Sequence, residues 1–187
     1  MIGFFRGLHC PFCRRQIAVL NRARPVLREH GVETLAVINT PLERARTYFS
    51  HRPMDVTLLA DPDCATHRAY GVPRIGFADP GDSAPAHWPV RTPPGMFENA
   101  RIDPTGELGI PAQPMQANDH LNTKDGFELT DADRVIYEAH AVQLGGQFLV
   151  DRGGIVRWSW TEAPNSPTEL CRFPSPDEMV AAARRLG

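Results

Sequence analysis

The sequence predicts an α/β domain in which helices cover a central, largely parallel β-sheet. Short apolar runs and helical patterns alternate through residues 1–71 in the order β-α-β-α-β-α, which is typical of a parallel sheet. Residues 147–160 contain two β-branched and aromatic runs around a Gly-Gly pair, which indicates an antiparallel hairpin. The chain has 187 residues, about the length of one ordinary domain.

The first strand and helix are predicted from residues 2–31. Ile2–Arg6 is an apolar run too short for a helix, so we expect a strand. Pro11 suits the first turn of a helix, where its missing N–H would have no partner. Pro25 is expected to kink this helix before it ends at His30-Gly31. The helical spacing is carried by four apolar residues, Ile17, Leu20, Ala23 and Leu27.

A second strand and helix follow directly. Val32–Asn39 is rich in β-branched residues and has a nearly continuous apolar stretch, as expected of a strand buried on both faces. Thr40 is a candidate cap for the next helix, and Pro41 would occupy its first position. This helix should end near His51.

The third strand is predicted at Val56–Ala60. Asp61 or Asp63 can cap a short helix behind it, because aspartate side chains accept hydrogen bonds from the free N–H groups of a first turn. That helix should end at Tyr70-Gly71. The parallel part of the sheet is then complete.

Residues 72–134 are expected to be an insertion or long loop within a single domain. Nine of the 18 prolines lie between residues 72 and 116, which argues against regular elements there. The segment lacks a periodic apolar core, so we expect it to lie over or beside the rest as a lid or interface. Residues 129–143 are ambiguous, because Thr130 could cap a helix while Arg134–Tyr137 could equally be extended.

The C-terminal part should contain a hairpin and a helix. Strands are expected at Gln147–Asp151 and Ile155–Trp160, joined by Arg152-Gly153-Gly154. Ser175–Glu178 has the pattern of a capping box with proline at the first helical position. The helix that it opens should run to Leu186.

Composition excludes several classes of protein. The formal net charge of −2 gives no reason to expect nucleic acid or anionic membranes as partners. No run approaches the roughly 18 apolar residues of a membrane span, and the N-terminus lacks the pattern of a secretory signal. We therefore expect a cytoplasmic protein. Its four cysteines should then be reduced thiols rather than a disulfide framework.

Chemistry is concentrated in the C-x-x-C motif of Cys10 and Cys13. The motif lies between the first strand and helix, so Cys10 should be at a helix N-terminus, where free N–H groups and the helix dipole stabilise a thiolate. Cys13 lies on the same side of the first turn and could close a disulfide with it. Cys10 should be the more acidic and more accessible thiol. A metal half-site and inert structural cysteines are the alternatives.

The segment Phe4–Arg14, FFRGLHCPFCR, resembles the start of thioredoxin-like proteins of the peroxiredoxin-like (AhpC/TSA) group. Two later stretches are also similar to that group, namely Asp61–Val72 with its DPD and YGV motifs and Gln143–Asp151. The resemblance covers about residues 1–75 and 140–187. It implies a thioredoxin-like α/β fold with a central mixed sheet flanked by helices.

The resemblance also implies roles for individual residues. Cys10 would be the attacking thiol, Cys13 the resolving thiol and Arg14 a positive neighbour. Substrate contacts would involve Pro11 and Phe12 of the motif, together with Gly145 and Gly146. The two glycines occupy the position where thioredoxin relatives place a cis-proline, and glycine allows a close approach of the substrate backbone.

The sequence departs from the peroxiredoxin pattern P-x-x-x-T-x-x-C. Gly3 and Gly7 stand at the positions of the proline and threonine. The hydroxyl that helps to seat a peroxide is therefore missing. This departure favours disulfide exchange over peroxide reduction as the activity of Cys10.

Several other residues are candidates for the site or for the core. Four arginines could stabilise a thiolate or bind an anionic substrate, and Arg6 is favoured among Arg6, Arg14, Arg15 and Arg157. Cys64 and Cys171 are interpreted as small buried hydrophobic residues. The indoles of Trp158 and Trp160 are expected to cover a face of the sheet. Histidines without ligand spacing are expected in solvent, namely His87, His120 and His140.

These observations favour a thiol-disulfide oxidoreductase that uses Cys10 for attack and Cys13 for resolution. A peroxiredoxin-type hydroperoxide reductase is the first alternative, and a non-catalytic binding or metal-binding module of the same fold is the second. No organic cofactor and no metal site are expected. Electrons would come from a thioredoxin or glutathione system, the substrate would be a disulfide or hydroperoxide, and a homodimer is possible.

Overall fold

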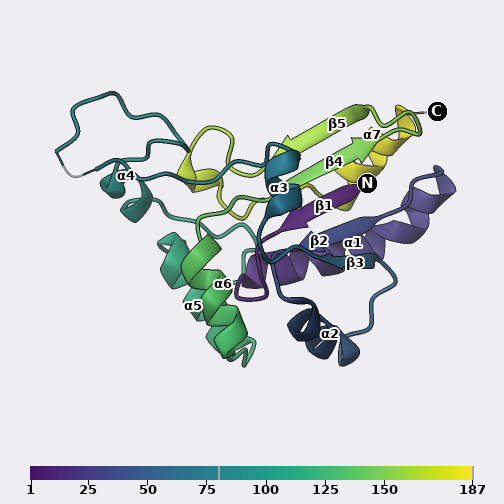
Figure 1. Ribbon diagram of the computed structural model, residues 1–187, viewed down its shortest axis with the longest axis horizontal. Coiled ribbons are helices and arrows are strands. Elements are labelled where there is room, and N and C mark those ends of the chain that lie inside the picture. The colour runs from purple at the N-terminus through teal and green to yellow at the C-terminus, as the bar shows by residue number, and fades with distance from the viewer. Residues whose placement is uncertain (80, 187) are drawn as a thin grey trace.

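The centre of the molecule is a mixed five-stranded β-sheet with the strand order β3-β2-β1-β4-β5 (Figure 1). The computed structural model describes residues 1–79 and 81–186. The first three strands are parallel, and β4 and β5 are antiparallel to their neighbours. This sheet confirms the predicted thioredoxin-like α/β fold. The strands are β1 (Ile2–Phe5), β2 (Leu35–Ile38), β3 (Thr57–Ala60), β4 (Gly146–Val150) and β5 (Val156–Thr161).

The central strand β1 is buried on both faces of the sheet. Successive side chains of a strand point to opposite faces, so Phe4 and Phe5 enter different clusters. Phe5 joins the main core, to which α1 contributes Ile17 and Leu20. Phe4 packs in a smaller cluster on the other face, with Phe148 among its members. A continuous apolar run is what such a doubly covered strand requires.

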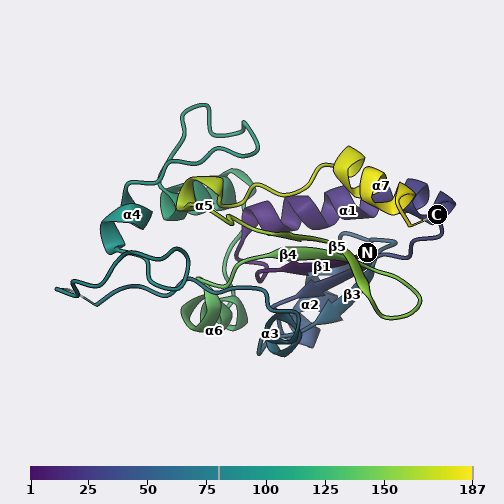
Figure 2. The ribbon, with the colours of Figure 1, turned by 90° about the horizontal axis from the view of Figure 1, so that it is seen from above.

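Helices cover the sheet from both sides (Figure 2). The helices α1 (Pro11–Glu29) and α7 (Pro176–Arg184) lie on one face, and α3 (Ala65–Ala69) and α6 (Asp131–His140) lie on the other. The helix α2 (Leu42–Ser50) buries Ala45 and Phe49 in the same core as α1. No helix within residues 1–79 and 81–186 has the length and apolar character needed to cross a membrane.

The predicted ends of several helices are confirmed. In α7 the Ser175 hydroxyl accepts a hydrogen bond from the Glu178 N–H, and the Glu178 carboxylate accepts one from the Ser175 N–H. The ambiguous segment 129–143 forms the helix α6, because Thr130 and Asp133 make the same reciprocal capping box. The helix α1 continues past Pro25 and has His30 as its C-cap, as expected.

The predicted cap of α2 is wrong. The Thr40 hydroxyl does not cap the helix but accepts a hydrogen bond from the Leu8 N–H at 3.2 Å. The cap position is taken by Pro41, which has no side-chain hydrogen bond to the helix. Thr40 therefore supports the turn that leads to the cysteine motif. In α3, by contrast, the Asp61 carboxylate accepts hydrogen bonds from the Ala65 and Thr66 N–H groups, as predicted.

The expectation that residues 72–116 lack regular elements is wrong in two places. The helix α4 (Pro94–Glu98) and the helix α5 (Pro114–Lys124) both begin with a proline. Proline is tolerated there because the first N–H of a helix has no partner within it. Together with α6, these helices gather at one end of the sheet (Figure 1).

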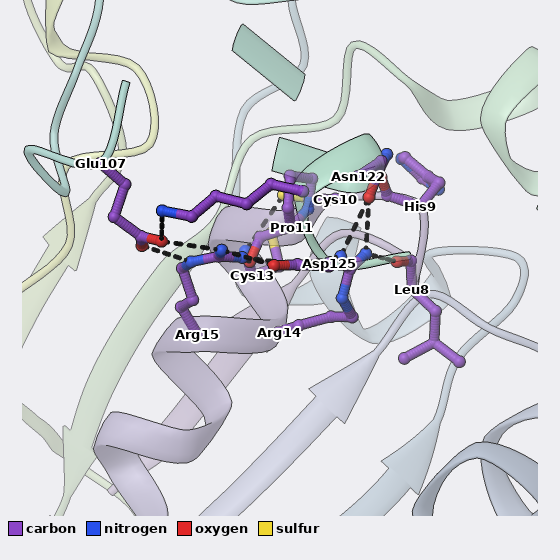
Figure 3. A network of polar contacts seen from close by, with 11 residues as sticks. Leu8, His9, Cys10, Pro11, Cys13, Arg14, Arg15, Glu107, Asn122 and Asp125 are labelled. Atoms are coloured by element: carbon purple, nitrogen blue, oxygen red, sulfur yellow. Dashed lines mark hydrogen bonds and ion pairs between the residues drawn. The ribbon is translucent and has the colours of Figure 1, made fainter. Parts of the chain in front are cut away.

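The insertion is fastened to the cysteine motif by a buried arginine (Figure 3). The Arg14 guanidinium donates hydrogen bonds to the Leu8 carbonyl at 2.6 Å and to Asn122 Oδ1 at 2.9 Å, and it pairs with Asp125 at 2.7 Å. Asn122 Nδ2 in turn donates to the carbonyl of His9 at 3.0 Å. Residues at the end of α5 are thus hydrogen-bonded to His9, which precedes the dithiol, and to Arg14, which follows it.

This network predicts that Asn122→Ala will lower the free energy of unfolding by about 1–3 kcal/mol. The substitution leaves the His9 carbonyl without its side-chain donor and Arg14 with one acceptor fewer, and an unsatisfied buried polar group costs about that much. Urea denaturation measures the change. The matched control is Asn99→Ala, since Asn99 is exposed in the same insertion, and it should change stability by less than about 0.5 kcal/mol. Equal effects of the two substitutions would contradict the proposed fastening.

Candidate active site

The Cys10 side chain caps the helix that contains Cys13. Cys10 follows β1 through a turn in which its N–H donates to the Gly7 carbonyl at 3.0 Å. Its Sγ accepts a hydrogen bond from the Cys13 N–H at 3.1 Å. The thiol therefore occupies the place of the serine or aspartate oxygen that usually caps a helix. The predicted position of Cys10 at a helix N-terminus is confirmed.

The two thiols have opposite acidity. Burial by itself disfavours a thiolate at Cys10, but side-chain hydrogen bonding with Cys13 and Cys171 and the charge of Arg6 outweigh it, so the pKa of Cys10 lies well below its usual value. Burial and the neighbouring Cys10 sulfur raise the pKa of Cys13 well above its usual value. The surroundings thus favour a thiolate at Cys10 and a protonated thiol at Cys13.

Arg6 is the cation of the site. It is only 6% exposed, and it leaves the end of β1 toward the C-terminal segment. Its Nη2 pairs with Glu162 at 2.7 Å and contacts Cys171 Sγ at 3.2 Å. Glu162 is completely buried and also accepts hydrogen bonds from the N–H groups of Gly145 and Cys171, each at 2.7 Å. The carboxylate therefore fixes the guanidinium beside the cysteines.

Cys171 is a third thiol of the site, which the sequence interpretation missed. It contacts Arg6 and exchanges a hydrogen bond with Cys10, and burial together with that bond raises its own pKa. It is half-buried and has a positive φ of 62°. Nothing local marks it in the sequence, because the contact with Arg6 joins residues 165 positions apart. Cys64, by contrast, is buried as expected, and burial and Asp61 raise its pKa to about 11.

The expectation that Cys10 is the more accessible thiol is wrong with respect to Cys171, and Cys10 is hardly more exposed than Cys13. Cys10 is 2% exposed and Cys13 is 1% exposed, whereas Cys171 is the least buried of the four. The hydrogen bond from the Cys13 N–H holds the Cys10 sulfur against the start of α1. Cys10 instead lines a cavity of about 290 Å³. The insertion contributes apolar walls to it, among them Ile75, Phe77, Phe97 and Met115.

His9 is a second residue of this cavity that the sequence interpretation did not assign to the site. It is 2% exposed, and neither ring nitrogen has a hydrogen-bond partner in the described part of the chain. Its ring meets Tyr137 edge-on, with the ring centroids 5.2 Å apart. Burial lowers the pKa of His9 to about 4, so the imidazole is neutral at physiological pH.

The other three candidate arginines have partners away from the cysteine sulfurs. Arg14 makes the anchoring contacts described above, and Arg15 pairs with Glu107 at 2.6 Å and Asp125 at 2.8 Å (Figure 3). Arg157 pairs with Asp151 in the β4–β5 hairpin. The pKa of Cys10 responds to Arg6, the arginine that the sequence favours.

The predicted substrate-contact residues are only partly brought together. Phe12 lines the cavity, and Pro11 is buried at the first position of α1. The N–H of Gly145 already donates to Glu162, and Gly146 pairs with Phe4 within the sheet. The backbone at the cis-proline position is therefore occupied by the protein itself.

The missing peroxiredoxin threonine has a steric explanation. A Cβ added to Gly7 would lie 2.5 Å from the Asn39 carbonyl oxygen and 2.9 Å from His9 Nδ1. At Gly3 a Cβ would lie 2.6 Å from the Phe5 ring. Real Cβ atoms do not approach other atoms so closely, so this turn excludes the threonine side chain.

The comparison with protein-family models finds the AhpC/TSA family over residues 1–90. This match confirms the resemblance to the thioredoxin-like, peroxiredoxin-like group that the motifs indicate. It supports the broad class of thiol-dependent redox or peroxidase enzymes. None of the curated proteins matches the chain. Within the described residues, no group of three or more His, Cys, Asp or Glu side chains is arranged to hold a metal ion.

The contact between Cys171 and Cys10 predicts that Cys171→Ala will raise the pKa of Cys10 by roughly one, because a lost hydrogen bond of about 1 kcal/mol corresponds to slightly less than one pH unit. Cys171→Ser retains an O–H donor and should restore much of the effect. Thiolate ultraviolet absorbance against pH measures the shift, with Cys64→Ala as the control. An unchanged Cys10 titration in Cys171→Ala would show that the contact has no electrostatic effect.

The crowding at Gly7 predicts that Gly7→Thr will not create a peroxidase. Overpacking of this kind costs about 1–3 kcal/mol, so the variant should unfold at lower urea concentration without a faster reaction of Cys10 with hydrogen peroxide. Gly95→Ala is the control, because its added Cβ would meet an atom only at 3.8 Å. A stable Gly7→Thr protein with an accelerated peroxide reaction would refute the steric explanation.

Proposed function

We propose that this thioredoxin-like protein, whose residues 1–90 match the AhpC/TSA family, is a thiol-disulfide oxidoreductase. One observation carries the proposal. Two thiols three residues apart at a helix N-terminus have opposite acidity, with the pKa of Cys10 lowered and that of Cys13 raised. A nucleophile and a resolving thiol in a dithiol cycle require this difference.

The reaction would proceed in two exchanges. The Cys10 thiolate attacks one sulfur of a substrate disulfide, so that a mixed disulfide forms and the other half leaves as a thiolate. Cys13 then loses its proton and attacks Cys10 Sγ, which releases the second half as a thiolate and leaves a Cys10–Cys13 disulfide. Two electrons pass to the substrate, and each released thiolate takes up a proton. Two thiols of a reductant, for which we propose a thioredoxin or glutathione system in the cytoplasm, then reduce the Cys10–Cys13 disulfide and leave as a disulfide themselves.

A peroxidase is the alternative, and the family match supports it. The Cys13 N–H and Cys171 hydrogen-bond with Cys10, and the charge of Arg6 stabilises its thiolate, but the Gly7 position provides no hydroxyl. The loss of one preorganised donor typically costs on the order of a hundredfold in rate. Stopped-flow mixing of the reduced protein with hydrogen peroxide separates the two functions. A second-order rate constant above about 10⁶ M⁻¹s⁻¹ would make the peroxidase the leading function.

The dithiol mechanism predicts opposite phenotypes for the two cysteines. Cys13→Ser should accumulate a stable mixed disulfide on Cys10, because the resolving step is removed. Cys10→Ser should lose turnover by at least about a thousandfold, since the nucleophile is absent. Intact-mass spectrometry after mixing with a disulfide detects the adduct, and peptide mapping locates it.

Cys64→Ser serves as the matched control, because Cys64 is equally buried but lies outside the cavity. It should behave like the unaltered protein. An adduct that forms on Cys13, Cys64 or Cys171 ahead of Cys10 would overturn the assignment of roles.

A further inference from the structure

The cavity in front of Cys10 is a built pocket with an apolar body and one polar end. Its apolar walls come from the insertion and from α1, where Phe12 lines it. The polar end is the part around Arg6, His9, Cys10 and Cys171, and Asn118 and Tyr137 add two further polar side chains to the lining. At about 290 Å³ it is at the small end of the range for ligand pockets. A small organic molecule fits such a space.

The charge of the cavity disfavours anions. Among the described residues that line it, Arg6 is the one cationic side chain, and its charge is balanced by Glu162 at 2.7 Å. His9 is neutral because burial lowers its pKa to about 4. The Cys10 thiolate then leaves the polar end with a net negative charge. An anionic substrate would be both desolvated and repelled there.

His9 provides an unused polar group at this end. Its imidazole is 2% exposed, lines the cavity and has no partner for either ring nitrogen in the described residues. A buried polar group without a partner costs about 1–3 kcal/mol, and a ligand that hydrogen-bonds to it would recover that cost. The neutral ring offers one N–H donor and one acceptor.

We propose that the cavity selects small, uncharged and largely apolar disulfides as the substrates of Cys10, and that His9 hydrogen-bonds to the polar end of the bound molecule. The inference rests on the proposed oxidoreductase function and specifies its substrate class. The Cys10 thiolate attacks the nearer sulfur, the S–S bond of the substrate breaks, and the departing half leaves as a thiolate that takes a proton from solvent. Cys13 completes the exchange as above.

The test compares two aromatic disulfides of similar shape. One probe is 4,4′-dithiodipyridine, which is uncharged at neutral pH, and the other is 5,5′-dithiobis(2-nitrobenzoate), which is a dianion. Stopped-flow absorbance gives the rate of the first exchange at Cys10, and each rate is divided by that of a free cysteine derivative with the same probe. After this correction the uncharged probe should react at least about tenfold faster than the dianion. Oxidised glutathione, which is large and charged, should be a poor substrate.

Two variants locate the selectivity in the cavity. Met115→Lys places a cation among the lining residues and should lower the preference for the uncharged probe by about tenfold or more. Met96→Lys is the matched control, because Met96 is an exposed methionine of the same insertion that does not line the cavity. His9→Phe retains an aromatic ring but removes both nitrogens. Because His9 also contributes to the lowered pKa of Cys10, the rates are compared per Cys10 thiolate, and on that basis the variant should react with the uncharged probe about tenfold more slowly.

The possible outcomes separate a failure of the proposed substrate class from a failure of the proposed oxidoreductase function. If the protein reacts with both probes in the ratio shown by the free thiol, the cavity does not select and the substrate class is wrong, although the oxidoreductase stands. If Met96→Lys changes the preference as much as Met115→Lys, the selectivity comes from surface charge and the inference fails. If Cys10 forms no mixed disulfide with either probe, both the inference and the proposed function are overturned.

Discussion

The buried ion pair of Arg6 and Glu162 is the interaction on which the site depends. Two charges removed from water are tolerated only when they are close together and their remaining hydrogen-bonding groups are satisfied. Here Arg6 also donates to the Gln143 carbonyl, and Glu162 also accepts from Gly145 and Cys171. The pair therefore joins the end of β1 to the start of β4, the end of β5 and the C-terminal segment. Loss of either charge would leave the other buried and unpaired, at a cost of about 3–5 kcal/mol.

A second arginine performs the corresponding task for the insertion. Arg14 lies one residue beyond the dithiol and is bonded to Asn122 and Asp125, while Arg6 lies four residues before it. The motif is thus held from both sides by segments that are distant in the chain. The insertion and the C-terminal segment both contact residues near the motif. Side chains from both segments line the cavity around Cys10. The fold protects the thiolate by the same contacts that position it.

The features that the sequence predicts correctly are those with a local physical cause. A strand followed by Cys10 and Pro11 defines a helix N-terminus, and the capping box at Ser175 defines another. Thr40 carries an equally local signal, but its hydroxyl serves the Leu8 N–H across the turn instead. Whether Thr40 caps a helix or accepts a hydrogen bond from a distant turn depends on tertiary contacts. The spacing of residues in the sequence does not reveal such contacts.

Glu162, Cys171 and His9 escape sequence analysis for the same reason. Glu162 and Cys171 reach Arg6 across 156 and 165 positions, and neither belongs to a motif. His9 is adjacent to the dithiol, yet its importance comes from burial and from the lack of a partner, which only the folded chain reveals. Arg6, by contrast, can be predicted from the sequence as a site residue, because it stands at the end of the predicted strand that leads directly into the motif.

The way in which Cys10 is activated also determines the direction in which the dithiol works. Arg6, the capping N–H and Cys171 stabilise the thiolate, which exists only in the reduced state. Oxidation to a Cys10–Cys13 disulfide removes that charge and forfeits these interactions, whereas Glu162 remains to neutralise Arg6 in both states. Stabilisation of the reduced form raises the reduction potential of a dithiol. The environment that stabilises the Cys10 thiolate therefore also makes the pair easier to reduce, so the dithiol is a weaker reductant than one without these contacts.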